Sequence, residues 1–452
     1  MGERGRIVHL PRTGNAPKAL RAWGLDKDFM DTLAFAVVAF FILTFALVSG
    51  RLQKTVISPP MVFVLFGLLV SNRVLGLIET STQNAFIQTL AELTLVLVLF
   101  TDASRIDLRL LRREHDLPIR LLSIGLPLTI ICGALVATLI FNVLTFWEAF
   151  VLGVILAPTD AALGQAVVSL PKVPVRIRQA LNVESGLNDG IALPFLLLFL
   201  SLAGAAEQTQ PAPYWVRFSL LQLVLGPAAG IAVGYFGGKL VVRGTRSGWI
   251  TQSFQSLSVL GLSVLAFSLA QLVGGNGYIA AFAAGLILGN TSRSVCTYLF
   301  EFGEAEGQLL TLLTLMLYGA VMVLPSLDHI NILVVLYGIL SLTVVRMLPV
   351  AISMIGVHLR WNSVLFLGWF GPRGIASILY GLLLLEKVNI TGREEIFSIT
   401  ITTVLMSVFI HGLTALPGAN WYAARVEKMK EEPDRPELAV VTEMPVRLQY
   451  HK

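Results

Sequence analysis

The sequence is poor in charged residues. Only 13% of its 452 residues are Asp, Glu, Lys or Arg, whereas a soluble globular protein carries about 25%. Hydrophobic residues make up 55% of the chain, and its mean hydropathy is +0.76. So few charges could not cover the surface of a soluble protein of this length. The composition therefore excludes a soluble globular domain and indicates a membrane protein.

Cysteine and alternating patterns are also scarce. The two cysteines, Cys132 and Cys296, have neither disulfide nor metal-site spacing, so we interpret them as packing residues. No strand-length segment alternates polar and apolar residues with period two, as the strands of a membrane β-barrel do. Helices are the other structure that satisfies its own backbone hydrogen bonds in lipid. The predicted fold is therefore an all-α polytopic membrane bundle.

Long apolar runs are plentiful. Each is long enough, or nearly long enough, to cross about 30 Å of hydrocarbon as a helix, and they predict about 13 transmembrane helices in residues 29–416. Residues 1–28 and 417–452 are polar and are expected to be an N-terminal tail and a cytoplasmic C-terminal tail. The predicted spans are 29–48, 60–78, 86–103, 118–142, 147–168, 179–204, 214–241, 250–273, 277–290, 307–324, 330–355, 364–386 and 396–416.

Lys and Arg are distributed unevenly among the predicted loops. Fourteen lie in the odd-numbered loops and four in the even-numbered ones. Because short cytoplasmic loops are enriched in these residues, we expect the C-terminus inside the cell and the N-terminus outside. The six Lys and Arg of residues 1–28 oppose this orientation. The loop bias also accounts for most of the net charge of +5, so no nucleic-acid partner is expected.

Acidic residues interrupt the sixth span, in the stretch 181–194. Ser185, Asn188 and Asp189 have i, i+3, i+4 spacing, which places them on one helix face, and Glu184 lies beside Ser185. We expect these groups at the mouth or in the first turns of the helix. An acid at membrane depth is costly unless it is paired, hydrated or protonated, so a functional role is the default interpretation. The oxygen ligands suit a hard monovalent cation, whereas a soft metal would require His or Cys.

Two proline-containing segments predict broken helices. Pro158 is followed by Thr159 and Asp160 inside the fifth span, and Pro372 with Arg373 lies in a Gly-Pro-Arg-Gly segment inside the twelfth. Proline removes a backbone donor, and broken backbone at this depth is tolerated where it is buried in protein or lines a wet cavity. A pair of interrupted spans points to an inverted-repeat transporter. The alternative for Asp160 is that it only caps the second half of its own helix.

Two further features concern helix contacts. Arg346 lies in the middle of the eleventh span and needs an acidic partner there, for which Glu184 is the candidate. Gly226, Gly230 and Gly234 repeat at helical spacing in the seventh span. Small residues at this spacing allow helices to approach closely, so the stripe indicates helix packing or a dimer face.

In this order, the motifs resemble the monovalent cation/proton antiporters of the NhaP type and, more distantly, the eukaryotic sodium/proton exchangers. The resemblance extends over about residues 30–416 and rests on Ala157–Asp160, Asn182–Gly190, Arg346 and Gly371–Gly374. It implies a homodimer of 13-helix protomers. Each protomer would have a dimerisation domain and a core with inverted repeats, in which two broken helices cross near Pro158 and Pro372.

The resemblance also implies a role for each motif residue. Asp189 would exchange the cation for a proton, and Thr159, Asp160, Ser185 and Asn188 would complete the site. A separate ion pair between Glu184 and Arg346 would hold helices six and eleven together, while Arg373 would compensate charge at the crossing. Relatives with Asn-Asp at positions 188–189 are electroneutral, so the resemblance implies electroneutral exchange.

The expected function is therefore exchange of a monovalent cation for H⁺ by alternating access, with sodium as the first candidate and potassium or lithium as alternatives. No cofactor and no enzymatic activity are expected, and the location would be a bacterial inner membrane. A cation channel could use the same oxygen ligands. An intramembrane hydrolase built on Ser185 is the weaker alternative, because no histidine is near it in sequence and His358 and His411 fall near the ends of predicted spans.

Overall fold

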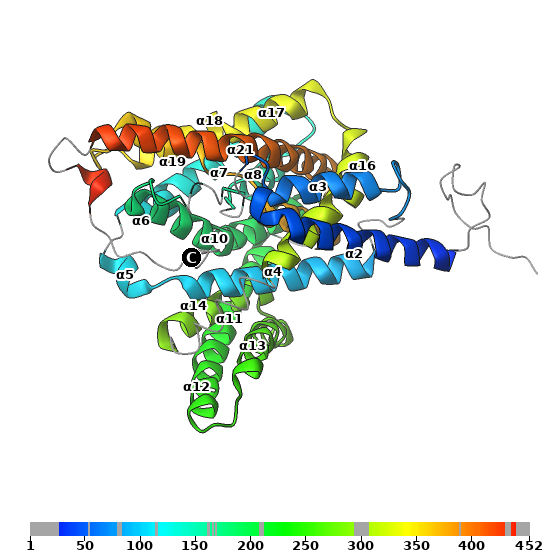
Figure 1. Cartoon of the computed structure of the whole chain (residues 1–452), viewed down its shortest axis with the longest axis vertical. Helices are drawn as coiled ribbons and strands as arrows, with labels where there is room; N and C mark the ends of the chain where they lie inside the picture. Colours follow the sequence, from blue (N-terminus) through cyan, green and yellow to red (C-terminus); the bar gives the residue numbers. More distant parts are fainter. Residues whose placement is uncertain are drawn as a thin grey trace, which may run out of the picture.

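The computed structural model describes residues 27–439 with short gaps (Figure 1). The residues outside the description are 1–26, 53–54, 79–83, 114–115, 161–162, 165–166, 168–169, 208–211, 293–306, 388–389, 430–434 and 440–452. Cys296 and the basic loop residues Lys54 and Arg293 are among them. The described residues are almost entirely helical, with one isolated bridge between Ser71 and Ile78. The predicted all-α class is confirmed.

Eight helices of the described residues are long and apolar enough to cross a membrane, and five shorter apolar helices accompany them. Each overlaps one of the predicted spans. The α-helices are α2 (Lys27–Leu52), α3 (Pro59–Val70), α4 (Ala85–Arg105), α5 (Leu108–Arg113), α6 (Asp116–Arg120), α7 (Leu126–Ile140), α8 (Phe146–Ile155), α10 (Val175–Glu207), α11 (Ala212–Ala232), α12 (Gly238–Arg246), α13 (Gln252–Leu272), α14 (Gly277–Thr291), α16 (Leu324–Leu327), α17 (Ile332–Leu342), α18 (Val344–Ser353), α19 (Trp361–Trp369), α20 (Ile375–Lys387) and α21 (Arg393–Met429). Short π-helical turns lie at η1 (Leu121–Gly125), η2 (Val233–Gly237) and η3 (Tyr318–Val323), and a 3-10 turn, η4, spans Pro436–Leu438.

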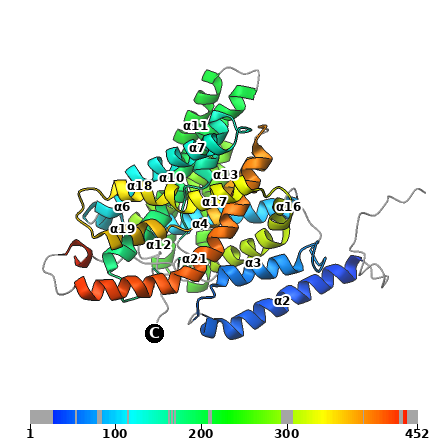
Figure 2. The same cartoon turned by 90° about the horizontal axis from the view of Figure 1, so that it is seen from above.

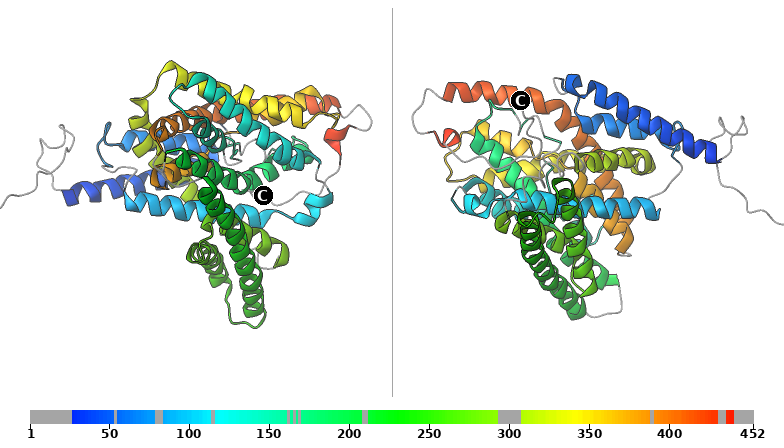
Figure 3. Two further views of the ribbon diagram at one scale, coloured as in Figure 1. Left: turned by 180° about the vertical axis from the view of Figure 1, so that it is seen from behind. Right: turned by 60° about the horizontal axis from the view of Figure 1, so that its bottom comes forward.

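Helix α10 lies at the centre of the bundle. It contacts α4, α11 and α14 on one side and α6, α8 and α19 on the other. Helices α11, α12 and α13 project from the rest of the bundle (Figures 1 and 3). Helix α2 lies at the periphery beside α3 (Figure 2). The acidic stretch of the sixth span is therefore enclosed by helices from distant parts of the chain.

The glycine stripe of the seventh span packs against α14 of the same chain. A side chain at Gly226, Gly230 or Gly234 would overlap the main-chain carbonyl oxygens of Asn276, Ala280 and Ala284, respectively. Such close approach of two backbones explains why small residues recur there. Of the two interpretations, helix packing within the chain is the one that the structure shows.

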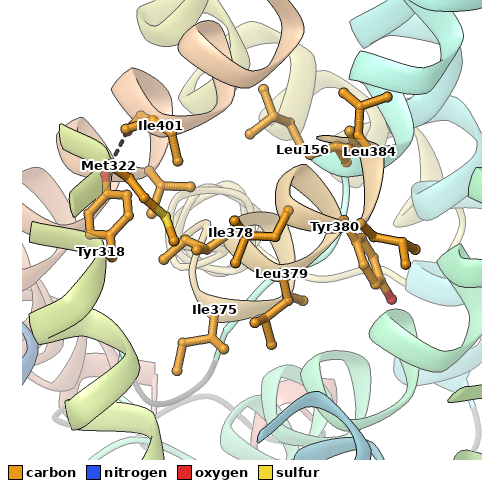
Figure 4. Close-up of a cluster of buried hydrophobic side chains, with 14 of the residues drawn as sticks. Leu156, Tyr318, Met322, Ile375, Ile378, Leu379, Tyr380, Leu384 and Ile401 are labelled. Atoms are coloured by element: carbon orange, nitrogen blue, oxygen red, sulfur yellow. Dashed lines mark hydrogen bonds between the residues drawn. The ribbon is translucent and has the colours of Figure 1, made fainter. Parts of the chain in front are cut away.

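Both expected breaks are present. Helix α8 ends at Ile155 and the chain continues without helix through Asp160, while α19 ends at Trp369 and α20 begins at Ile375. Hydrophobic side chains of α20, including Ile375, Ile378 and Leu379, enter the largest apolar cluster of the bundle (Figure 4). The crossing is thus anchored in the core.

Several helix boundaries differ from the predicted spans; α3, for example, ends at Val70, whereas the second span was expected to continue to 78. Helix α10 begins at Val175, so Glu184 and Asp189 lie in about its third and fourth turns, and the expectation that they lie at its mouth or in its first turns was wrong for Asp189. Arg176 and Arg178 had made its first turns look like a loop. Helix α21 continues through Pro417 to Met429, past the expected end at 416, because one proline inside a long helix removes only one hydrogen bond.

A turn of the C-terminal tail also packs onto the bundle. Glu437 is fully buried and accepts hydrogen bonds from the backbone N–H of Arg360, at 2.6 Å, and from the Ser363 hydroxyl, at 3.0 Å. Arg360 immediately precedes α19, so the carboxylate caps that helix. Arg176, at the start of α10, donates to the carbonyl oxygen of Pro436. The tail therefore joins the starts of α10 and α19, and α19 leads to the second break.

Candidate functional site

The two broken segments bond directly to each other. The backbone N–H of Asp160 donates to the carbonyl oxygen of Pro372, at 2.8 Å. In return, the Asp160 carboxylate Oδ2 accepts from the backbone N–H of Ile375, at 3.1 Å. Asp160 therefore caps α20 across the crossing, whereas the sequence alternative had it capping the second half of its own helix. Gly374 is required there, because a side chain would overlap the Asp160 carboxylate.

Arg373 completes the crossing with the opposite charge. Its side chain is fully buried, and Nη1 donates to the carbonyl oxygens of Ala157 and Pro158, the latter at 3.2 Å. These carbonyls follow the C-terminal end of α8, where the helix dipole is negative, while Asp160 lies at the positive N-terminal end of α20. Arg373 therefore stabilises the C-terminal end of α8, and Asp160 stabilises the N-terminal end of α20.

Helix α10 bonds to the first break through its polar face. The Ser185 hydroxyl donates to the main-chain carbonyl oxygen of Thr159, and the Asn188 side-chain amide donates to Thr159 Oγ1, both at 2.7 Å. Asn188 and Thr159 are nearly inaccessible to solvent. The structure thus brings together four of the residues that the sequence nominated, Thr159, Asp160, Ser185 and Asn188, which lie on two segments, the first break and α10.

Asp189 lies beside these residues on α10 and is 9% exposed. Its main-chain carbonyl oxygen accepts a hydrogen bond from the hydroxyl of Tyr380 on α20, at 2.5 Å. The next residue, Gly190, lies against the ring of Phe282 on α14, where any side chain would overlap the ring. Asp189 is therefore enclosed by α20 on one side and α14 on another.

A pocket of about 250 Å³, including space open to solvent, reaches the crossing. It is lined by Thr159, Asp160, Gly164, Val167, Leu181, Ser185, Phe370 and Pro372. Asn188 and Asp189 do not line it and lie one turn farther along α10 than Ser185. The pocket extends toward the start of α10, which is the end of the bundle with the loop residues Lys172 and Arg176.

Glu184 and Arg346 form the ion pair expected from the sequence. Arg346 Nη1 lies 2.5 Å from Glu184 Oε1, and Nη2 lies 2.8 Å from Oε2. Both side chains are 2% exposed. This is a bidentate guanidinium–carboxylate pair, and it connects α10 with α18.

Sequence reasoning missed a polar network on α21. The backbone N–H of Arg373 donates to the Ser407 hydroxyl, at 2.7 Å, and Ser407 Oγ lies 3.2 Å from His411 Nδ1. His411 Nε2 lies 3.0 Å from the carbonyl oxygen of Trp369. With the proton on Nε2, a neutral imidazole satisfies both contacts, and α21 holds both ends of the second break. The i, i+4 spacing of Ser407 and His411 was a possible signal, but a serine and a histidine four apart are common.

The network also weakens the hydrolase alternative. The expectation that His411 lies near a span end was wrong, because α21 continues well beyond it and buries the ring. The partners of its ring are Ser407 and Trp369. The Ser185 hydroxyl donates to the main-chain carbonyl oxygen of Thr159.

Comparison with known proteins agrees with this architecture. Residues 36–421 match the family described as sodium/hydrogen exchanger, transmembrane. A probable Na⁺/H⁺ antiporter of Schizosaccharomyces pombe is 24% identical over 79% of this chain and 49% of its own length, and the K⁺/H⁺ antiporter NhaP2 of Shewanella is 23% identical over 90% and 69%. The chain thus spans about half the length of the yeast relatives.

The fold has a solved counterpart. The sodium proton antiporter MjNhaP1 of Methanocaldococcus jannaschii superposes with a TM-score of 0.70 at 21% identity, over 87% of this chain and 99% of that one. At this level of identity the likeness concerns the fold alone. Because the family match extends over most of the sequence, the chain is an integral membrane protein that belongs to the sodium/hydrogen exchanger family.

Proposed function

We propose that the protein is a secondary active antiporter that exchanges a monovalent cation for H⁺. The observation that carries this proposal is the assembly of oxygen-bearing side chains from the first break and α10 at the crossing, where the backbone of the second break bonds to Asp160. Thr159, Asp160, Ser185, Asn188 and Asp189 would form the cation and proton site. Hard oxygen ligands suit sodium, potassium and lithium, and relatives named for Na⁺ and for K⁺ exchange support the same class of substrate.

Charge balance at the site supports electroneutral exchange. Glu184 is neutralised by Arg346 at hydrogen-bond distance. Asp160 and Arg373 lie on opposite sides of the crossing and carry opposite charges. We assign the exchange to Asp189, whose carboxylate would be neutralised by either one cation or one proton. Because a bare carboxylate crosses a low-dielectric barrier only at high cost, the loaded or protonated form would move, which gives one proton for each cation.

The pocket suggests the direction of access. Its lining residues Val167 and Leu181 lie toward the Lys- and Arg-rich end of the bundle, which we assign to the cytoplasm together with the C-terminus. Alternating access would then require that the site close here and open on the opposite side. The resemblance to NhaP-type proteins also suggests a homodimer in a bacterial inner membrane, which crosslinking in membranes would test.

The test is cation-driven proton flux in proteoliposomes, with NaCl, KCl and LiCl in turn and with the membrane potential clamped or imposed. Asp189→Asn should abolish exchange while the protein still folds. Asp328→Asn, in an exposed pair with Arg73 outside the spans, is the matched control and should retain exchange. Cation-dependent pH recovery by Asp189→Asn would refute the assignment of the site, and an exchange rate that follows the imposed potential would refute electroneutrality.

A further inference from the structure

The buried tyrosine Tyr380 makes an unusual contact with the candidate site. Its hydroxyl donates to the main-chain carbonyl oxygen of Asp189 at 2.5 Å, and the side chain is fully buried. In Figure 4 its hydroxyl oxygen is directed away from the aliphatic side chains of the same helix, such as Ile378 and Leu379. Tyr380 therefore places its one polar atom on the backbone of the residue that we propose exchanges the cation for the proton.

Helix α10 is weakly bonded just after Asp189. Pro194 lies inside the helix and has no N–H group, so the carbonyl oxygen of Gly190 lacks its usual donor four residues later. Gly190 itself adds backbone freedom to the same turn. A hydrogen bond from another helix to the Asp189 carbonyl thus holds the backbone where α10 holds it least.

Helix α20 bonds to both acidic residues of the site. Its first residue, Ile375, donates its backbone N–H to the Asp160 carboxylate, and Tyr380, five residues later, bonds to Asp189. Five residues of α-helix rise about 7.5 Å. One helix thus contacts both the carboxylate of Asp160 and the backbone of Asp189, and it constrains the distance between them.

We propose that Tyr380 is a positioning residue that sets Asp189 relative to Asp160 and thereby determines the affinity for the cation. The inference rests on the proposed function. A bound cation needs ligands from both the first break and α10, whereas a proton needs only the Asp189 carboxylate. Loosening Asp189 should therefore weaken cation binding more than proton binding, and the two compete for this carboxylate.

The chain offers a matched control for this test. Tyr318 is also fully buried, and its hydroxyl donates to a main-chain carbonyl oxygen, that of Ile401, at 2.6 Å (Figure 4). Tyr318→Phe and Tyr380→Phe therefore remove the same kind of bond from equally buried rings. Only Tyr380 bonds to a residue of the candidate site.

The experiment measures sodium-driven proton flux in proteoliposomes for the wild type and both variants, with thermal unfolding of each in detergent at increasing NaCl. Tyr380→Phe should raise the KM for sodium about three- to tenfold, as expected for one hydrogen bond, with a smaller change in the maximal rate. Its pH profile at low sodium should move to higher pH, because protons then compete better. The NaCl concentration that gives half of the maximal thermal stabilisation should rise in parallel. Tyr318→Phe should leave the KM for sodium, the pH profile and this concentration unchanged.

Failure of this proposal can be separated from failure of the proposed function. Wild-type vesicles without exchange would refute the function and the inference that depends on it. Wild-type exchange with an unchanged sodium KM in Tyr380→Phe, or the same change in Tyr318→Phe, would overturn the positioning role alone. Loss of folded Tyr380→Phe protein without a change in KM would likewise assign the hydroxyl to stability.

Discussion

Removal of one partner from the Glu184–Arg346 pair should destabilise the protein strongly. The substitutions are Glu184→Gln and Arg346→Gln, separately and together. The pair is bidentate, at 2.5 and 2.8 Å, and both side chains are 2% exposed. Each single variant leaves a buried charge without its counter-ion, and the double variant leaves none.

The magnitude follows from this geometry. Breaking a buried pair by removing one partner costs about 3–5 kcal/mol, because the remaining charge stays desolvated. That cost is a large part of the roughly 5–15 kcal/mol by which a folded protein is stable. Replacing both partners removes both desolvation costs, so the double variant should be more stable than either single variant.

The assay is thermal unfolding in detergent, combined with cation-driven proton flux in proteoliposomes. Both single variants should unfold at lower temperature and accumulate poorly, and the double variant should recover much of the loss. Asp328→Asn is the control, because Arg73 and Asp328 form an exposed pair, with side chains 52% and 54% exposed. Single variants that keep the wild-type stability but lose exchange would show that the pair serves transport, and strictly additive losses would refute the pairing argument.

Three further outcomes are expected. Gly190→Ala should destabilise the protein by about 1–3 kcal/mol through overlap with the Phe282 ring. Phe282→Ala should relieve this overlap in a double variant. A Gly190→Ala variant as stable as the wild type would show that α10 and α14 separate easily. Glu437→Ala should cost about 1 kcal/mol, measured by thermal unfolding, because α19 loses its cap, and an unchanged midpoint would argue against the cap. The Arg73 guanidinium lowers the pKa of the Asp328 carboxyl, so the stability that this pair adds should be present above the ordinary Asp pKa of about 3.9 and be lost as the pH falls through the lowered pKa. Asp328→Asn should therefore lose less stability than the wild type when the pH is lowered through this range. An identical loss of stability in the two proteins would contradict this.

The crossing illustrates how the protein keeps charge at membrane depth. Asp160 bonds to the N-terminus of α20, and Arg373 bonds to carbonyl groups beyond the C-terminus of α8. Helix ends carry partial charges of opposite sign, so each side chain has a fixed counter-charge in the backbone. The Ser407–His411 network on α21 bonds to the backbone at both ends of the second break. The charges of Asp160 and Arg373 are thus stabilised by main-chain groups that the two breaks free.

Sequence alone predicted the class of fold and nominated the residues of the candidate site. The apolar runs located the spans because backbone groups in lipid must bond within helices. Pro158 and Pro372 marked the breaks because proline removes a donor. Arg346 and Glu184 could be matched because a buried charge needs a partner. Each of these inferences follows from a large free-energy cost that can be recognised from a short stretch of sequence.

Tertiary structure alone decided the contacts between distant segments. The sequence could not show that Asp160 caps α20 rather than its own helix, or that the glycine stripe of α11 packs on α14. Nor could it show that Tyr380 bonds to Asp189 from 191 residues away. Such contacts depend on how helices pack, and many buried tyrosines, serines and glycines would satisfy the same local rules. The sequence determined where charge and broken backbone must be stabilised. The packing of the helices determined which groups stabilise them.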